Sequence, residues 1–217
     1  MQQKNEPLRK LIILAMLAAI AYLLVVVVRI PVILFLKYEP KDVAITIGGF
    51  LLGPLATVVI SLVVSLLEMV TVSETGLIGC VMNFISTCSF ACTAAIIYKK
   101  KHTLAGAVIG LLAGSVVMIC VMLLWNWLIT PLYMGGTREA VAAMLLPVFL
   151  PFNALKAGLN SALVLCLYKP LTAALRKAKL LPQTNGAGVK HRIELYLFAG
   201  ALLVTCIVFL LVMQGII

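Results

Sequence analysis

Long runs of apolar residues dominate this chain, and short polar stretches separate them. A helix needs about 20 apolar residues to cross the hydrocarbon core of a bilayer. Six runs approach or exceed that length, and each predicts a membrane-spanning helix: residues 11–28, 55–72, 76–98, 103–130, 151–168 and 193–213. The pattern therefore predicts a protein that crosses the membrane several times.

A shorter apolar run covers residues 43–52 and ends at Gly53 and Pro54. It cannot cross a bilayer, so it predicts a half-depth helix or a helix that packs strongly inside the protein. Counted in chain order, it is the second span, and residues 193–213 form the seventh. The preceding stretch, residues 29–42, mixes apolar and charged residues and is predicted to be a loop. Asp42 is expected to cap the second helix.

Polar positions after residue 168 indicate how the chain is divided. An amphipathic tail that ends at residues 176–179 should lie at the membrane interface. We predict a six-span membrane domain over residues 1–180, a polar linker over residues 181–192 and an additional transmembrane helix within residues 193–217.

The composition fits an all-α polytopic membrane protein. Apolar residues make up 64% of the chain and charged residues 11%, whereas soluble domains are about half apolar and about a quarter charged. Within the fifth span, Gly106, Gly110 and Gly114 recur every fourth residue. Such a ridge of small residues would let another helix approach closely.

Lysine and arginine are distributed unevenly across the predicted membrane. With the N-terminus inside, twelve lie on the cytoplasmic side: Lys4, Arg9, Lys10, Lys99, Lys100, Lys101, Lys169, Arg176, Lys177, Lys179, Lys190 and Arg192. Four lie outside, namely Arg29, Lys37, Lys41 and Arg138, and Lys156 lies within the membrane. The positive-inside tendency therefore predicts a cytoplasmic N-terminus and, after seven spans, an external C-terminus. Membrane topology accounts for the net charge of +10, so no nucleic-acid partner is predicted.

The sequence offers little sign of a cleaved leader, a metal site or an enzyme. The first apolar run resembles a signal peptide, but further spans follow it and no convincing cleavage site precedes Arg29, so it should remain as an anchor. Six cysteines lie in apolar segments without a C-x-x-C motif or a nearby histidine, which favours packing over metal or redox chemistry. The sequence also contains none of the common hydrolase or phosphate-loop motifs.

The most unusual polar positions lie on the sixth span. Asn153, Lys156 and Asn160 share one face of a helix, because side chains three, four or seven residues apart lie above one another. Pro151 suits the first turn of that helix, where its missing N–H would be unpaired anyway. A lysine inside a bilayer is costly unless it finds a partner or water, and such residues usually mark substrate paths. This face is predicted to be the wall of a ligand pocket.

Further polar residues from three other spans should lie at the same depth. They are Glu68, Asn83 and Asn126, and all are predicted to occupy the outer half of the membrane together with Asn153 and Lys156. The inner half has too few such groups for an ion path across the membrane. The pattern therefore predicts a closed-bottomed pocket that opens outward.

Several of these positions allow a second interpretation. Glu68 could reach the outer surface alone, or it could form an ion pair with Lys156. Asn83 could bond another helix or a ligand. Trp125 and Trp127 fit an interfacial aromatic belt better than a stacking platform.

Four stretches together give the chain a resemblance to a known family. They are residues 36–43 running into 48–54, Gly79 with residues 82–84, residues 152–156 and residues 167–171. Over residues 8–179 the chain resembles the riboflavin-specific substrate-binding (S) component of the energy-coupling factor (ECF) vitamin transporters. The resemblance implies six helices that hold the vitamin near the outer face, between the first extracellular loop and spans four to six.

The resemblance also implies site residues and partners. Asn153 and Lys156 match the asparagine and lysine that open the last family span, and the remaining substrate-binding candidates are Asn126, Asn83, Gly79, Lys37, Tyr38 and Asp42. Ala15 and Ala19 fit the A-x-x-x-A pattern that contacts the coupling membrane (T) subunit, which works with two ATPase (A) subunits. Location in a bacterial cell membrane is implied as well. The seventh span departs from the family pattern, and the sequence assigns it no function.

Riboflavin is a flat ring system with polar edges and a neutral tail, which suits an apolar slot with a few well-placed donors. Asn153 could pair with the amide-like edge of the ring, and Lys156 could donate to a carbonyl oxygen. The absence of an arginine cluster favours a neutral vitamin over strongly anionic ligands, and no cofactor is expected. Residues 29–42 could close over the slot as a gate, stiffened by Pro31 and Pro40. The alternatives are another vitamin, such as pantothenate or thiamin, or a small membrane enzyme that acts on lipids.

Overall fold

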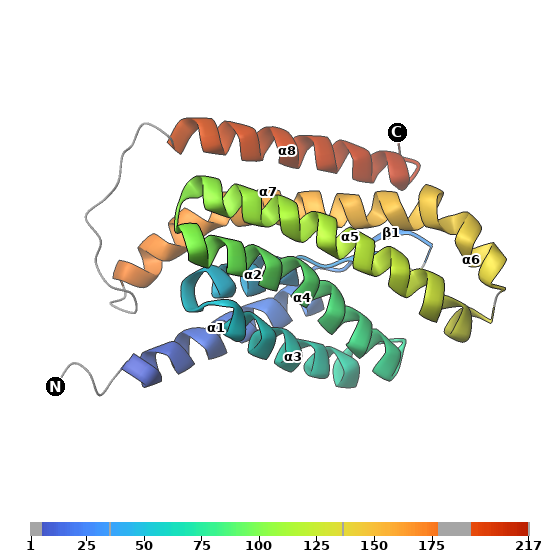
Figure 1. Cartoon of the computed structure of the whole chain (residues 1–217), viewed down its shortest axis with the longest axis horizontal. Coiled ribbons are helices and arrows are strands. Elements are labelled where there is room, and N and C mark those ends of the chain that lie inside the picture. Colours follow the sequence, from blue (N-terminus) through green and yellow to red (C-terminus); the bar gives the residue numbers. More distant parts are fainter. Residues whose placement is uncertain (1–5, 35, 136, 178–191, 217) are drawn as a thin grey trace.

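The structure is a computed structural model that describes residues 6–34, 36–135, 137–177 and 192–216. Within these ranges the elements follow one another along the chain as α1 (Glu6–Val27), β1 (Ile30–Ile33), β2 (Leu36–Tyr38), α2 (Lys41–Leu52), α3 (Pro54–Thr71), α4 (Gly76–Lys101), α5 (Leu104–Met134), α6 (Arg138–Met144), the π-helical turn η2 (Leu145–Phe149), α7 (Leu150–Lys177) and α8 (Arg192–Met213). Figure 1 shows the long helices lying side by side, with the start of α1 and the end of α8 at opposite ends of the bundle. The predicted all-α membrane fold is confirmed.

Six helical stretches of the described residues are long and apolar enough to cross a membrane. They are α1, α3, α4, α5, the continuous stretch from α6 into α7, and α8. The end of the predicted tail, residues 178–179, and the predicted linker up to residue 191 fall outside the described residues. The division into a six-span domain and an added helix therefore stays a prediction.

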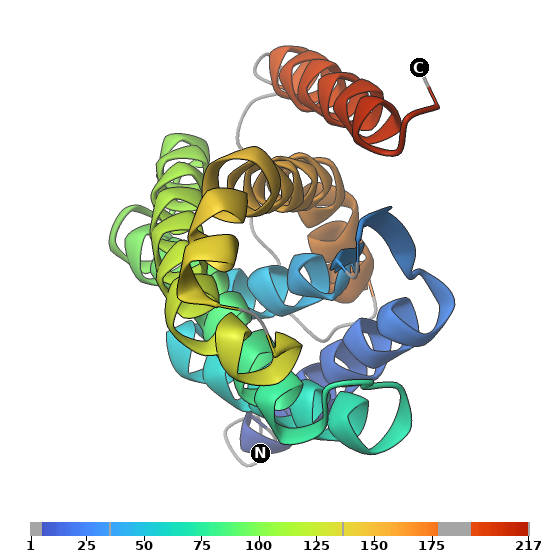
Figure 2. The same ribbon diagram turned by 90° about the vertical axis from the view of Figure 1, so that its right-hand side faces the viewer.

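Helix α2 is the short second span, and α1, α3, α4 and α7 pack around it (Figure 2). Every residue from Lys41 to Phe50 is buried, so the helix is a packed interior element. Two glycines allow this packing, since a Cβ at Gly48 would lie 2.8 Å from Ile60 Cδ1 and one at Gly49 would collide with Thr57 Oγ1. Gly53 then adopts a φ of +95° and turns the chain into α3.

The predicted glycine ridge of the fifth span lies against α4. A Cβ at Gly110 would lie 2.8 Å from the Ala94 carbonyl oxygen, and one at Gly114 would collide with the Phe90 carbonyl oxygen. Only the absence of side chains lets the two backbones come this close. The predicted close approach of another helix is confirmed.

The sixth span begins earlier than the sequence suggested. Helical backbone already starts at Arg138, and Pro151 therefore lies inside a continuous helical stretch rather than at its first turn. Pro147 and Pro151 cannot donate backbone hydrogen bonds, and between them Leu150 N–H bonds to Leu145 O, five residues back. This π-helical turn accommodates the two prolines, so the helical stretch continues through them.

Residues 29–42 contain a two-stranded antiparallel hairpin that the sequence analysis treated as loop. Ile30 pairs with Tyr38, and Pro31 pairs with Lys37. β-Branched and aromatic residues in these positions favour extended backbone. Leu34 lies at the tip, 65% exposed and with a φ of +51°.

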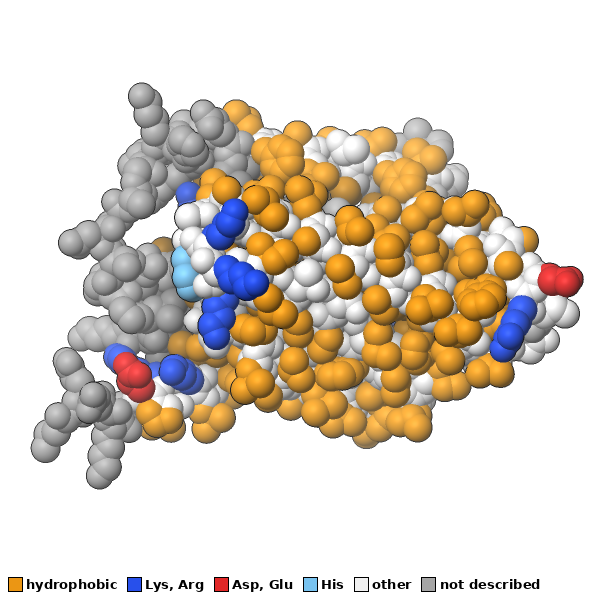
Figure 3. Space-filling view, in the orientation of Figure 1, with side chains coloured by type: hydrophobic (Ala, Val, Ile, Leu, Met, Phe, Trp, Pro, Cys, Tyr) orange, Lys and Arg blue, Asp and Glu red, His pale blue; other side chains and the backbone are white. Residues whose placement is uncertain are grey.

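Charged residues collect at the two ends of the bundle, and an apolar surface lies between them (Figure 3). Lys99, Lys100 and Lys101 form the last turn of α4, at the end of the bundle where α1 begins. This arrangement supports a multi-pass membrane protein, and the apolar band has the position expected for contact with lipid.

Candidate ligand site

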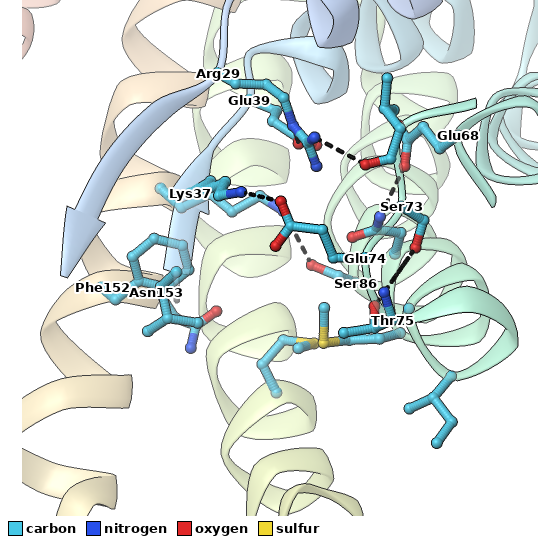
Figure 4. Close-up of a pocket in the computed structure, with 18 of the residues that line it drawn as sticks. Arg29, Lys37, Glu39, Glu68, Ser73, Glu74, Thr75, Ser86, Phe152 and Asn153 are labelled. Atoms are coloured by element: carbon cyan, nitrogen blue, oxygen red, sulfur yellow. Dashed lines mark hydrogen bonds and ion pairs between the residues drawn. The ribbon is translucent and has the colours of Figure 1, made fainter. Parts of the chain in front are cut away.

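A cavity, called here the outer cavity, lies beside the β-hairpin and between α3, α4, α5 and α7 (Figure 4). Its lining includes six of the eight predicted substrate-binding residues: Asn153, Lys156, Asn126, Asn83, Gly79 and Lys37. These residues come from three helices and the hairpin. The structure therefore brings together polar groups that lie far apart in the sequence.

The other two predicted residues, Tyr38 and Asp42, lie behind the cavity wall. Tyr38 donates its hydroxyl to Asn160 Oδ1 at 3.0 Å. Burial of the Tyr38 side chain raises the pKa of its phenol well above the ordinary value of 10.0. The hydroxyl therefore stays protonated at physiological pH and remains a donor that ties the hairpin to α7.

Asp42 is fully buried and joins three helices. Its carboxylate accepts hydrogen bonds from Thr87 Oγ1 at 2.6 Å and from Asn160 Nδ2 at 3.1 Å, and it forms an ion pair with Lys156 Nζ at 3.2 Å. The predicted role of Asp42 as a helix cap is wrong, because Pro40 occupies the cap position and makes no side-chain cap bond. The carboxylate instead links α2 to α4 and α7.

Lys156 has the buried partner that a lysine within a membrane requires. Besides its ion pair with Asp42, its Nζ lies 3.4 Å from Ser86 Oγ. The side chain also lines the outer cavity and keeps a small exposed fraction of 9%. Its ammonium group is thus fixed in position at the cavity wall.

Glu68 takes part in a second buried network. Its carboxylate accepts from Lys41 Nζ at 2.5 Å and from Asn83 Nδ2 at 2.7 Å. Of the interpretations considered for Glu68, both exposure at the surface and pairing with Lys156 are wrong, since the side chain is 2% exposed and pairs with Lys41. For Asn83 the structure shows the bond between helices, and the residue also lines the cavity.

The second network extends to the hairpin. Lys41 Nζ lies 3.4 Å from Glu39 Oε2, and Glu39 Oε1 accepts from Arg29 Nε at 2.7 Å. Arg29 also donates to the Val72 carbonyl oxygen at the end of α3. Figure 4 shows Arg29, Glu39 and Glu68 along one side of the cavity.

Sequence reasoning missed Arg29, Glu39 and Lys41 as parts of the site, because it treated residues 29–42 as a loop and counted Arg29 and Lys41 only as external charges. Lys41 is 1% exposed and therefore as buried as any core residue. A signal was present in the alternation of basic and acidic residues along this short segment. Opposite charges so close to an apolar helix need partners once they are buried.

Asn126 and Asn153 each use their amide nitrogen within their own helix. Asn126 Nδ2 donates to Met122 O and Asn153 Nδ2 donates to Phe149 O, both at 2.7 Å. Asn126 Oδ1 accepts from Thr130 Oγ1 at 2.9 Å. These bonds fix both amides at the cavity wall, and Figure 4 shows Asn153 beside Phe152 on α7.

An exposed ion pair lies at the mouth of the cavity. Lys37 Nζ of β2 lies 2.6 Å from Glu74 Oε1 in the turn between α3 and α4. The hydrogen bond and positive charge of Lys37 lower the pKa of Glu74 below its ordinary value of 4.5. This bridge joins the hairpin to the opposite rim.

The formal charges along the cavity wall balance. Three cationic residues line it, Arg29, Lys37 and Lys156, and three carboxylates line it as well, Glu39, Glu68 and Glu74. Each cation forms an ion pair with a carboxylate. The wall therefore offers many polar atoms without a surplus charge.

The remaining candidates lie away from the cavity lining. Ala15 and Ala19 are exposed, one turn apart on α1. Trp127 is 41% exposed, whereas Trp125 is half-buried. Among the described residues, no group of three or more His, Cys, Asp or Glu side chains could hold a metal ion.

Comparisons with known proteins agree on one family. The model of the family described as "ECF transporter, substrate-specific component" matches residues 9–168. The riboflavin transporter RibU of Staphylococcus aureus (strain TCH60) is 28% identical over 178 residues, covering 78% of this chain and 93% of RibU. The riboflavin transporter FmnP of Bacillus subtilis (strain 168) is 29% identical over 161 residues, covering 68% and 84%.

A solved structure described as "Structure and mechanism of the S component of a bacterial ECF transporter" has the same fold. It is 29% identical, with a TM-score of 0.66, and the match covers 81% of this chain and 99% of that one. About a fifth of this chain thus has no counterpart in the solved structure.

Proposed function

Because this chain belongs to the family of substrate-specific components of ECF transporters, we propose that it captures riboflavin from outside the cell for ATP-driven uptake. Two relatives similar to it along most of their length are riboflavin transporters. The chain itself acts as a binding subunit and catalyses no reaction. Riboflavin is its transported ligand rather than a cofactor.

The observation that carries the proposal is the charge-balanced, polar wall of the outer cavity. Each lysine or arginine of the wall already has a carboxylate partner, so an anionic ligand would find no unpaired cation there. Amides and hydroxyls are left to recognise the edges of a neutral molecule, and Phe152 and Met122 supply apolar surface. A flat, neutral ring system such as that of riboflavin fits this chemistry.

Within the cavity we assign the leading contacts to α7. Asn153 presents its amide to the polar edge of the ring, and Lys156 donates to a ring carbonyl oxygen. Asn83, Asn126 and Gly79 form the facing wall from α4 and α5. Lys37 closes the mouth, whereas Tyr38 and Asp42 hold the hairpin and Lys156 in place and do not touch the ligand.

The proposed partners are a coupling T subunit and two ATPase subunits. Ala15 and Ala19 present small side chains on the exposed surface of α1, where a helix of the T subunit could approach closely. The basic end of the bundle faces the cytoplasm together with the N-terminus. The outer cavity then opens on the external side of the bacterial cell membrane.

Riboflavin fluorescence provides the test. The full-length protein, purified in detergent, should carry a yellow flavin or, when stripped, quench riboflavin fluorescence with one site per chain. Pantothenate and thiamin should fail to displace the flavin. A colourless protein that leaves riboflavin fluorescence unchanged would refute the proposal, and displacement by either competitor would reassign the vitamin.

A further inference from the structure

Helix α8 has one face that packs on the protein, although almost all of its residues are apolar. Its buried residues are Ala199, Cys206 and Leu210, and the half-buried Leu202, Leu203 and Met213 lie on the same face. Leu197, Val204, Val208 and Val212 are exposed. A helix held only by lipid would need no such stripe, so α8 has a specific docking surface.

This stripe docks first on α7. A Cβ at Gly158 would lie only 2.6 Å from Cys206 Sγ, so the glycine allows the close approach of the two helices. Figures 1 and 2 both show α8 lying along α7 on the outside of the bundle. α7 is the helix that carries Asn153 and Lys156.

The C-terminal end of α8 also reaches the β-hairpin. Cys206 and Leu210 belong to one buried apolar cluster with Val32, Leu36 and Tyr38 of the two strands. Just beyond the helix, Gln214 Nε2 donates to the Pro31 carbonyl oxygen at 2.5 Å. The hairpin is therefore held on its outer side by α8.

The same hairpin forms part of the cavity on its inner side. Leu36 and Lys37 line the outer cavity, and Lys37 bridges to Glu74 across the mouth. Leu36 thus belongs both to the cavity wall and to the cluster that contains α8. An outward movement of the hairpin would separate it from α8 as well as from the rim.

We propose that Leu210 and Gln214 of α8 are positioning residues that hold the β-hairpin closed over the outer cavity and so slow ligand release. Neither residue lines the cavity, so both act through Leu36 and Lys37. The slower release of the ligand rests on the proposed riboflavin function, whereas the holding of the hairpin by α8 does not. Opening breaks the contacts to α8, so their loss should accelerate entry and release of the ligand together.

The experiment uses the full-length protein with three variants. Gln214→Ala removes one surface hydrogen bond and should leave folding intact, and Leu210→Ala removes the buried contact. Val212→Ala is the matched control, because Val212 lies between the two on the exposed face. Hydrogen exchange of the hairpin amides measures closure without any ligand, and stopped-flow quenching of riboflavin fluorescence measures both rate constants.

We expect Gln214→Ala to accelerate hairpin exchange and riboflavin release by about fivefold, as for one lost hydrogen bond. Leu210→Ala should accelerate both by about tenfold or more, because truncating a buried leucine costs more than losing one hydrogen bond. The association rate should rise as well, and Val212→Ala should match the wild type. Unchanged hairpin exchange in Gln214→Ala would overturn the positioning role, whatever the ligand does. Faster exchange in a protein that binds no riboflavin would uphold the positioning role and refute the proposed ligand.

Discussion

The two ion pairs made by the cavity lysines differ in nearly every respect. Asp42 and Lys156 meet inside the bundle, and hydrogen bonds from Thr87 and Asn160 complete the shell of the carboxylate. Lys37 and Glu74 meet at the surface, and the Glu74 side chain is 73% exposed. One pair is buried at and behind the cavity wall, and the other lies across the mouth of the cavity.

The difference separates a fixed part of the site from a movable part. A buried pair is hard to separate, because each charge would remain in a medium that solvates it poorly. An exposed pair can exchange its partner for water at little cost. We infer that the part of the site that Asp42 ties together, where α2 meets α4 and α7, keeps its shape while the hairpin moves to admit the ligand.

The largest effect is expected from Asp42→Asn. The substitution leaves Lys156 buried without an anionic partner and should lower the free energy of unfolding by about 3–5 kcal/mol. Chemical unfolding in detergent measures the loss, with the exposed Glu139→Gln as control. If the two variants unfold alike, the Asp42–Lys156 pair does not belong to a fixed part of the site.

A smaller loss is expected from Glu68→Gln. Lys41 keeps Glu39 as a second carboxylate at 3.4 Å, and a glutamine can still accept the bond from Asn83. The expected loss in unfolding free energy is about 1–3 kcal/mol. The same unfolding experiment checks it, and a loss larger than that of Asp42→Asn would reverse the ranking of the two buried networks.

At the mouth, Lys37→Ala should leave the unfolding transition at its wild-type position, because an exposed ion pair contributes little. Riboflavin association and release should both become faster, since the hairpin loses its bridge to the opposite rim. Stopped-flow fluorescence measures both rates. A clearly destabilised variant would show that this bridge belongs to the fixed part of the site.

The smallest effect concerns pH. The pKa of Glu74 is lowered by Lys37, so the bridge contributes fully above the ordinary pKa of 4.5 and is lost as the pH falls through the lowered value. The difference in release rate between wild type and Glu74→Gln should therefore stay constant between about pH 5 and 7. It should disappear at lower pH, and a difference that varies in the neutral range would point to another titrating group.

The sequence was sufficient for the helices and for the cavity residues that lie on regular helical faces. Apolar runs marked the membrane-spanning elements, and the three- and four-residue spacing placed Asn153 and Lys156 on one face. Gly110 and Gly114 likewise indicated the close approach that α4 makes. These features depend on local periodicity, which a single sequence displays.

The pairing of charges could not be predicted, because it depends on tertiary contacts between distant segments. Asp42 was predicted as a helix cap and a ligand contact, and Lys41 as an external charge of the loop, yet both side chains are buried and pair with charged residues of other helices. The hairpin was not predicted, because its strands of four and three residues are too short to show an alternating apolar and polar pattern. The early start of the sixth span was not predicted either, because Pro147 and Pro151 are residues that usually interrupt a helix, and here a π-helical turn accommodates them.

The most direct measurement is a fluorescence titration of riboflavin with the wild-type protein and with Asn153→Ala. Asn153 bonds within its own helix, so its removal leaves the Asp42–Lys156 pair intact. We expect tight binding to the wild type and a loss of about 1–3 kcal/mol in binding free energy for the variant, as for a lost buried hydrogen bond. Equal affinities in both proteins would contradict the assigned site.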